Sequence, residues 1–504
     1  MGKASNTSER TSTPVTESEG SSDWLVSDAG EDKKFSYSFG LIASCLGCVL
    51  GTGNIWRFPR IVATAIYMTS SMNIKCLNLA YFSAYFSVVV GWCFYYFYVA
   101  CAWSNLPSTE PESKEIFESF IGTYWPLGLH TLDLLICGVA VFKGVKGIEI
   151  ANSCMVPIQL IIVISTFYWS LSREYADVGI KFMFSPDWSM FANPQVYVEA
   201  ACQNAFDTAA GMGLFSAYAA YFTRETGAVR FGTLLPMVNN LVSLVCGLMI
   251  FSTVFSTLIQ TQPTLTIPQI VTIMKESGPG STGLTFTWIP VLMSRLGVAG
   301  RVLCALFFLC LSFAGVTSMI GYIELTARTI QDFGVKRHLA TIAALIVSFL
   351  VGVPSALSID VLQNQDFVWG FALMISGMCY CALVIRYNPV KYRRVIVNDF
   401  GLKDWKLPFI WVILIVYVLA LRISIPDYFL PPSARLWFIL FILLGGLNIV
   451  VYCCKWDLLK DSSTQGYDPY RLEEAYAQND LSKDPSSVFE EDGEEGFHAK
   501  SEMF

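Results

Sequence analysis

Long apolar segments alternate with short polar ones through most of the chain. Eleven of the apolar segments are long enough, or nearly so, for the roughly 20 residues that cross a hydrocarbon core about 30 Å thick. A polar loop at 104–119 and a longer connector at 261–297, with room for short helices, separate some of them. The pattern predicts an all-α polytopic membrane protein with spans near 38–64, 76–104, 126–143, 150–170, 197–222, 233–260, 298–326, 339–356, 366–386, 407–424 and 435–453.

The composition agrees with a membrane protein and gives little support to an enzyme. Hydrophobic residues make up 54% of the 504 residues and charged residues 14%, against about 25% charged in soluble proteins. The 3 histidines are scattered, and most of the 15 cysteines lie inside apolar segments, where they act as small buried hydrophobic residues. No cluster of cysteine and histidine with metal-ligand spacing, phosphate-binding loop or nucleophile elbow is present in the sequence.

Both ends of the chain are polar and acidic. The first 34 residues lack the apolar core of a cleavable signal peptide. We therefore predict a disordered cytoplasmic tail at 1–35, a transmembrane domain at 36–455 and a disordered acidic tail at 456–504. The acidic tail is interpreted as solubilising, with recruitment of a partner as the alternative.

Lysine and arginine in the short loops predict the orientation of the chain. The loops after the fifth, seventh and ninth spans are basic, whereas 357–365 and 425–433 contain no lysine or arginine. The basic loops are therefore predicted to be cytoplasmic. Counting back from them places the N-terminus outside, although Lys33 and Lys34 favour the inside. One membrane crossing is missing between Pro59 and Tyr81.

Two apolar segments contain residues that do not suit a continuous spanning helix. The first contains 51-GTGNIWRFPR-60 and the second contains 206-FDTAAGMG-213. An aspartate at the bilayer centre costs at least about 2.5 kcal/mol, and glycine costs about 1 kcal/mol relative to alanine in a helix. Close helix packing could explain either segment alone. Two interrupted helices, each the first of a five-helix set, are more typical of a transporter whose unwound backbone binds ions and substrate.

These two segments, together with 307-FFLCLSFAGVTSMIGYIE-324, resemble the first, sixth and eighth helices of the neurotransmitter:sodium symporter family, the sodium- and chloride-dependent transporters. The stretches 143–159 and 185–206 resemble the same family, and the likeness covers about 36–455. The resemblance implies a leucine-transporter-like inverted five-helix repeat with helices 1 and 6 broken. It also implies Na⁺-coupled symport of amino acids or related small solutes by alternating access.

The resemblance implies two Na⁺ sites made of backbone and side-chain oxygens, which suit a hard cation. One would use Val49, Asn54, Asp207 and Asn239. The other would use Gly47, Leu50, Ala314, Thr317 and Ser318. By themselves, Thr317 and Ser318 would be expected to bond back to their own helix, and the surrounding motif favours the ion site instead.

One departure from the family concerns chloride. Asp207 stands where chloride-dependent members usually carry a serine, and Ser243 matches another chloride-contacting position. A fixed carboxylate beside Na⁺ supplies the negative charge that chloride would supply. We therefore predict an anion site at Asp207 and Ser243 that works without chloride.

The resemblance also implies a substrate site and two gates. Gly51 is typical of members whose amino-acid substrate keeps its own carboxylate, held by the amides of Thr52 and Gly53. Phe86 stands where the family has a tyrosine that touches this carboxylate. The predicted substrate site comprises Gly51, Thr52, Gly53, Phe82, Phe86, Phe206, Ala209, Met212, Ser318 and Tyr322. The predicted outer gate pairs Arg57 with Asp366, and the predicted inner gate pairs Asp332 with the Lys33–Lys34 region.

The second helix of the family pattern is absent. Only 33 residues separate Pro59 from Trp92, and the glycine-rich start of that helix is not found there. The chain is therefore predicted to have about 11 spans where the family has 12. Two hypotheses follow: a symporter in the plasma membrane, or an inactive or regulatory transporter-like membrane protein. Membrane lipid and a small-molecule substrate are the expected partners, with no nucleic acid.

Overall fold

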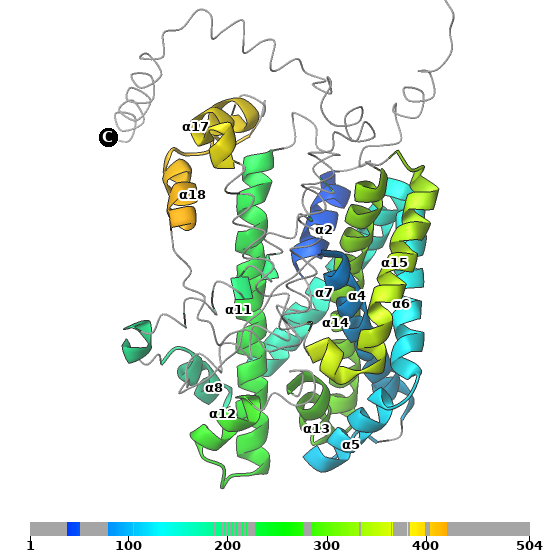
Figure 1. Ribbon diagram of the computed structural model, residues 1–504. Coiled ribbons are helices and arrows are strands. Elements are labelled where there is room, and N and C mark those ends of the chain that lie inside the picture. Colours follow the sequence, from blue (N-terminus) through cyan, green and yellow to red (C-terminus); the bar gives the residue numbers. More distant parts are fainter. Residues whose placement is uncertain are drawn as a thin grey trace, which may run out of the picture.

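The computed structural model describes a bundle of helices (Figure 1). The described residues are 38–50, 79–103, 105–185, 188–192, single residues between 196 and 218, 227–275, 284–331, 334–363, 365, 381, 384–398 and 404–420. Within these residues all regular structure is helical. The segment 60–78, where the second helix is predicted to be missing, and both predicted tails lie outside the described residues.

Most predicted spans within the described residues are present as long apolar helices. Six of them are long and apolar enough to cross a membrane, and they correspond to the spans predicted near 76–104, 126–143, 150–170, 233–260, 298–326 and 339–356. The larger helices are α2 (Ser38–Val49), α4 (Leu79–Ala102), α6 (Trp125–Phe142), α7 (Gly144–Leu171), α11 (Ala228–Thr261), α14 (Gly297–Gln331), α15 (Arg337–Leu357) and α18 (Ile410–Ala420).

Shorter helices lie at the two ends of the bundle. They are α5 (Glu110–Ile121), α8 (Ala176–Met183), η2 (Trp188–Ala192), α12 (Ile267–Lys275), η4 (Leu284–Trp288), α13 (Ile289–Ser294), α17 (Pro389–Lys391) and η5 (Tyr392–Asn398). The connector at 261–297 therefore contains short helices, as predicted. Figure 1 shows α5, α12 and α13 at one end and α17 at the other. This is the separation expected if the basic loop near 386–406 and the connector face opposite sides of the membrane.

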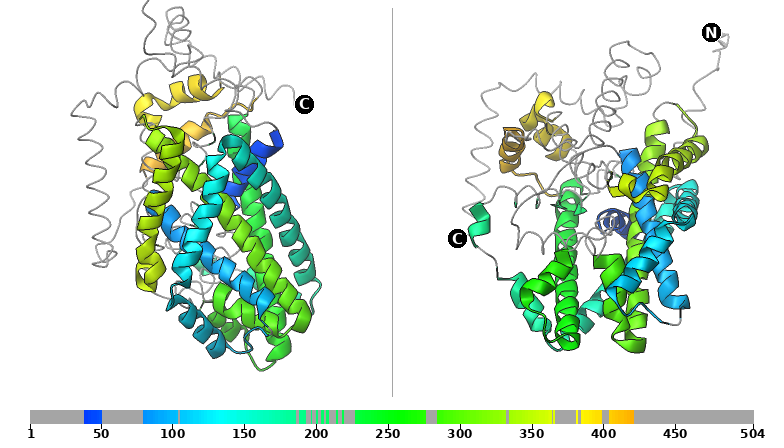
Figure 2. Two further views of the ribbon diagram at one scale, coloured as in Figure 1. Left: turned by 90° about the vertical axis from the view of Figure 1, so that its right-hand side faces the viewer. Right: turned by 60° about the horizontal axis from the view of Figure 1, so that its bottom comes forward.

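Helix α14 is at the centre of the bundle. It packs against α4, α7, α15, α6 and α2, and Figure 2 shows the bundle from two further directions. Residues 304–324 of α14 are largely buried, among them Phe308, Thr317 and Ile323. A helix that is apolar and buried on most sides is a core helix rather than a lipid-facing one, so α14 is the element against which the site is built.

The prediction of a loop over all of 104–119 is wrong, because α5 begins at Glu110. Pro111 lies in its first turn, where a missing N–H costs nothing, and the acidic Glu110 and Glu112 suit the positive end of the helix dipole. Ser108 donates to Glu112 from its backbone N at 2.8 Å and from Oγ at 3.0 Å. These bonds hold the pKa of the Glu112 carboxyl below its ordinary value.

Aromatic side chains attach α5 to the bundle. Phe120 stacks on Tyr95 with 4.0 Å between ring centroids. Phe117 and Trp92 form an edge-to-face pair at 5.1 Å. Such contacts add about 0.5–1.5 kcal/mol each beyond the area they bury. The helix forms because its few apolar side chains find partners on α4, which no local pattern of the polar segment reveals.

A buried carboxylate connects α14 to α15 near the predicted cytoplasmic side. Glu324 is fully buried and accepts hydrogen bonds from Arg328 Nε at 2.9 Å and from Arg337 Nη2 at 2.7 Å. Arg337 also donates to the carbonyl of Val141 on α6 at 3.3 Å. Arg328 and Arg337, both in the basic region after the seventh predicted span, thus pair with one acid. A buried charge that is paired in this way avoids the cost of an uncompensated buried charge.

We expect Gly315→Ala to destabilise the bundle. A Cβ at Gly315 would lie 2.4 Å from Cγ2 of Val90 on α4, and a β-branched valine has few rotamers with which to move away. Overpacking of this kind costs about 1–3 kcal/mol. Thermal unfolding of the purified protein, followed by tryptophan fluorescence, should show a lower midpoint than for the wild type.

Gly232→Ala is the matched control. Gly232 lies in α11, where a Cβ would meet no atom within 4 Å, so the higher helix propensity of alanine should leave stability unchanged or raise it by up to about 1 kcal/mol. Equal midpoints for the two variants would contradict the close packing of α4 on α14.

Candidate functional site

The predicted second ion site brings the end of α2 against the middle of α14. Thr317 Oγ1 lies 3.1 Å, and Ser318 Oγ 3.2 Å, from the carbonyl oxygen of Gly47, and both hydroxyls donate to it. The same hydroxyls also reach the carbonyl of Ala314 in their own helix, at 3.2 Å and 3.1 Å. Four of the predicted oxygen-bearing residues therefore meet at one place.

Gly47 allows this approach because it has no side chain. A Cβ at this position would lie 3.0 Å from Cβ of Thr317 and 3.3 Å from Cγ2 of Val156 on α7. Gly47 and Thr317 are buried and Ser318 is 2% exposed. The oxygens form a compact set of neutral dipoles shielded from water, which is the chemistry of a site for a hard monovalent or divalent cation.

Leu50, another predicted ligand, is positioned by a residue that the sequence did not single out. Its carbonyl oxygen accepts a hydrogen bond from Gln159 Nε2 of α7 at 3.0 Å, and both residues are buried. The available signal was a glutamine inside the apolar segment 156-VPIQLIIVI-164. A polar side chain within a span needs a partner, but the sequence alone does not say which one.

The structure also brings together the residues predicted for the anion site. Ser243 Oγ donates to Asp207 Oδ2 at 3.1 Å, and Gln203 Nε2 donates to Asp207 Oδ1 at 2.7 Å. Asp207 is 5% exposed. Asn239 is buried one helical turn before Ser243 on α11, so their side chains share a face. Gln203 is a second residue that the sequence analysis missed.

Two residues predicted for the substrate site are in contact. The rings of Phe86 on α4 and Tyr322 on α14 form an edge-to-face pair with centroids 5.9 Å apart and planes inclined by 74°. Both side chains are buried, with 3% and 4% exposure. Phe82 lies one turn before Phe86 on α4. Tyr322 is also one turn after Ser318, so α14 carries residues predicted for both ion and substrate.

Several predicted residues lie outside the described residues, and their placement is not tested. Val49 and Leu50 are the last described positions of the first interrupted segment. The predicted residues beyond the described part are Gly51, Thr52, Gly53, Asn54, Arg57, Phe206, Ala209, Met212, Asp332 and Asp366.

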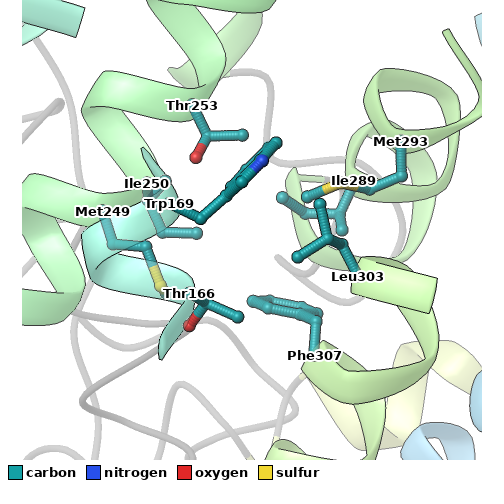
Figure 3. A pocket seen from close by; sticks show the side chains of 9 residues that line it. All are labelled: Thr166, Trp169, Met249, Ile250, Thr253, Ile289, Met293, Leu303 and Phe307. Carbon is teal, nitrogen blue, oxygen red and sulfur yellow. The ribbon is translucent and has the colours of Figure 1, made fainter. Parts of the chain in front are cut away.

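A small apolar cavity lies elsewhere in the bundle (Figure 3). It has a volume of about 20 Å³ and is bounded by α7, α11, α13 and the outer half of α14, with Trp169, Met249 and Phe307 among its lining residues. This is room for about one water molecule, and apolar cavities stay dry. It is too small for an amino acid and shares no residue with the sites described above.

Comparison with known proteins identifies the class. The profile described as "Sodium:neurotransmitter symporter family" matches residues 114–429. An uncharacterized sodium-dependent transporter of Methanocaldococcus jannaschii is 24% identical over 64% of this chain and 74% of its own length. An uncharacterized sodium-dependent transporter of Bacillus subtilis is 26% identical over 70% of this chain and 87% of its own length. The sodium- and chloride-dependent GABA transporter ine of Drosophila melanogaster is 21% identical over 68% of this chain and 45% of its own length.

A solved structure agrees in fold. The crystal structure of MhsT in complex with L-phenylalanine superposes with a TM-score of 0.59, at 22% identity, over 77% of this chain and 99% of that one. The matched profile and the long apolar helices define an integral, multi-pass membrane protein of a class of sodium-dependent transporters, which is not a class of enzymes. The chain belongs to the sodium:neurotransmitter symporter family.

We expect Gln159→Met to lower stability by about 1 kcal/mol. The variant keeps the volume but leaves the Leu50 carbonyl without its donor, a loss of about 1–3 kcal/mol. Removing Gln159 Oε1, which has no partner among the described residues, offsets part of it. The midpoint of thermal unfolding without Na⁺ measures the change.

Gln260→Met serves as the comparison. Gln260 is exposed near the end of α11 and accepts a hydrogen bond from Arg173, and exposed substitutions usually change stability by less than about 0.5 kcal/mol. A variant at 159 as stable as the variant at 260 would show that Gln159 does not support the end of α2.

Proposed function

We propose that this protein is a Na⁺-coupled symporter of amino acids or related small solutes that works by alternating access. The observation that carries the proposal is the meeting of the Gly47 carbonyl with the hydroxyls of Thr317 and Ser318. In this proposal the hydroxyl hydrogens rotate away from the Gly47 carbonyl, and the three oxygens face one Na⁺. The Leu50 and Ala314 carbonyls complete the set.

A second Na⁺ is proposed at Asp207, with Asn239, Asn54 and the Val49 carbonyl. Asp207 accepts hydrogen bonds from Gln203 and Ser243. Carboxylate oxygens are ligands that suit a hard cation. Na⁺ therefore suits this position, and its binding would be favoured by the negative charge.

The proposed substrate is an amino acid because the residue at the start of the segment predicted to be unwound is Gly51. Without an acidic side chain there, the protein supplies no counter-ion for a substrate amine, and the substrate brings its own carboxylate. Phe86 carries no hydroxyl, and its ring contacts Tyr322. The wall near α4 is therefore apolar, which favours a substrate with an apolar side chain. This choice is also compatible with the neighbour MhsT, whose structure contains L-phenylalanine.

The experiment that tests the function is uptake of a pooled set of labelled amino acids, with and without Na⁺, in cells that display the protein at the surface. The double variant Thr317→Ala with Ser318→Ala removes two ion ligands while adding no volume. We expect its apparent Na⁺ affinity to fall at least about tenfold, which corresponds to about 1.4 kcal/mol.

Ser312→Ala is the matched control within α14. Ser312 is as buried as Ser318 and donates back to the Phe308 carbonyl at 2.7 Å, so its loss removes the same kind of helix bond away from α2. We expect it to keep the Na⁺ affinity of the wild type. Surface display without any Na⁺-dependent uptake would favour the alternative, an inactive or regulatory transporter-like protein.

We further propose that transport does not require chloride. Asp207 supplies a fixed negative charge beside the proposed Na⁺, and Ser243 already donates to it. Wild-type uptake should be unchanged when chloride is replaced by gluconate. Asp207→Asn removes the charge at nearly constant shape, so chloride should then stimulate the remaining Na⁺-dependent uptake. Strict chloride dependence of the wild type would refute this part of the proposal.

A further inference from the structure

A second buried carboxylate lies in the middle of α6, away from the residues assigned above. Asp133 is fully buried between α6 and its neighbours. Its Oδ1 accepts a weak hydrogen bond from Cys137 Sγ at 3.7 Å, and its Oδ2 has no hydrogen-bond partner among the described residues. A lone aspartate at this depth is costly and by default marks a functional position.

The groups that face Asp133 include no cation. From α4 they are the Ser87 hydroxyl and the Cys93 thiol, and from α6 itself the Cys137 thiol. No lysine, arginine or second carboxylate of the described part interacts with it. On α14, the carbonyl of Val316 accepts a hydrogen bond from Cys137 Sγ at 3.8 Å. An ionised Asp133 would therefore be a buried charge with no counter-ion.

Ser87 connects Asp133 to a buried histidine. Ser87 Oγ lies 2.9 Å from His130 Nδ1, and His130 Nε2 lies 3.4 Å from the carbonyl oxygen of Phe349 on α15. The ring fits closely, because a Cβ at Gly352 would lie 2.4 Å from Nε2. His130 is fully buried and also stacks on Phe349, with 5.7 Å between ring centroids.

The polar groups of this cluster are satisfied without any buried charge if Asp133 carries a proton. A carbonyl accepts but cannot donate, so the Phe349 contact requires a hydrogen on Nε2, and burial favours the neutral imidazole over the charged one. His130 Nδ1 is then an acceptor, and the single hydrogen of Ser87 donates to it. Ser87 Oγ is left as an acceptor facing Asp133, an arrangement that favours a protonated carboxyl over a carboxylate.

We propose that Asp133, Ser87 and His130 form an intramembrane proton-binding site, in which Asp133 carries a proton beside Ser87. The site holds one proton and has no net charge. It packs against the helices of the ion and substrate sites: Ser87 follows Phe86, and Val316 precedes Thr317. Loss of the proton leaves a buried negative charge between α4, α6 and α14.

Infrared spectroscopy of the purified full-length protein tests the protonation directly. At neutral pH we expect the C=O stretching band of a protonated carboxylic acid, shifted in heavy water and absent from Asp133→Asn. Asp177→Asn, which removes an exposed carboxyl paired with Lys181, should leave that band in place. A neutral-pH spectrum of Asp133→Asn with the same carboxylic-acid bands as the wild type would overturn the proposal.

The pH dependence of stability provides a second measurement. The folded protein holds a proton that Asp133 of the unfolded chain has released above about pH 4. Raising the pH from about 4 to alkaline values should therefore lower the unfolding temperature of the wild type relative to Asp133→Asn. Asparagine keeps a donor toward Ser87 and has no proton to lose. Parallel pH profiles for these two proteins would also overturn the proposal. Neither measurement requires a transported substrate, so the outcome is independent of the proposed function.

Discussion

The site depends on how the last carbonyl groups of α2 are satisfied. Inside a membrane, water is not available to bond the free carbonyls at a helix end, so other parts of the protein must do so. Here α14 supplies the hydroxyls of Thr317 and Ser318 to Gly47, and α7 supplies the amide of Gln159 to Leu50. Three helices that are far apart in the sequence are brought together by the polar groups of one helix end. Those same oxygens are the ones suited to bind a cation.

Small residues make these contacts possible. Gly47 of α2 lies against Thr317 of α14. On α14, Gly321 leaves room for Cys48 of α2, and Gly315 leaves room for Val90 of α4. Helices in a bilayer gain little from burying apolar surface against each other, because lipid is equally apolar, so close packing and hydrogen bonds have to hold them together. Helix α14, which carries several of the proposed ligands, is thus also packed closely against its neighbours.

The three buried carboxylates described above have different surroundings, and these decide what each can do. Glu324 is paired with two arginines, which gives it a structural counter-charge between α14 and α15. Asp207 accepts hydrogen bonds from the neutral donors Gln203 and Ser243, and its carboxylate oxygens suit a hard cation. Asp133 has two thiols and a hydroxyl as neighbours, a setting in which a proton is the least costly partner. The residue type is similar in all three cases, and the electrostatic environment differs.

The sequence by itself determined the class of fold and most of the described spans, because a bilayer selects each long apolar segment independently of its neighbours. It also indicated Thr317, Ser318, Gly47, Asp207 and Ser243 through their motifs. Helix α5 was missed, because its mean hydropathy is low and the partners of Phe117 and Phe120 lie on α4. The donors Gln159 and Gln203, the pairing of Glu324 and the joining of Ser87 to His130 were decided only by the tertiary structure. Most of these interactions link segments on different helices, and the energy of a buried polar group depends on partners that its own segment does not contain.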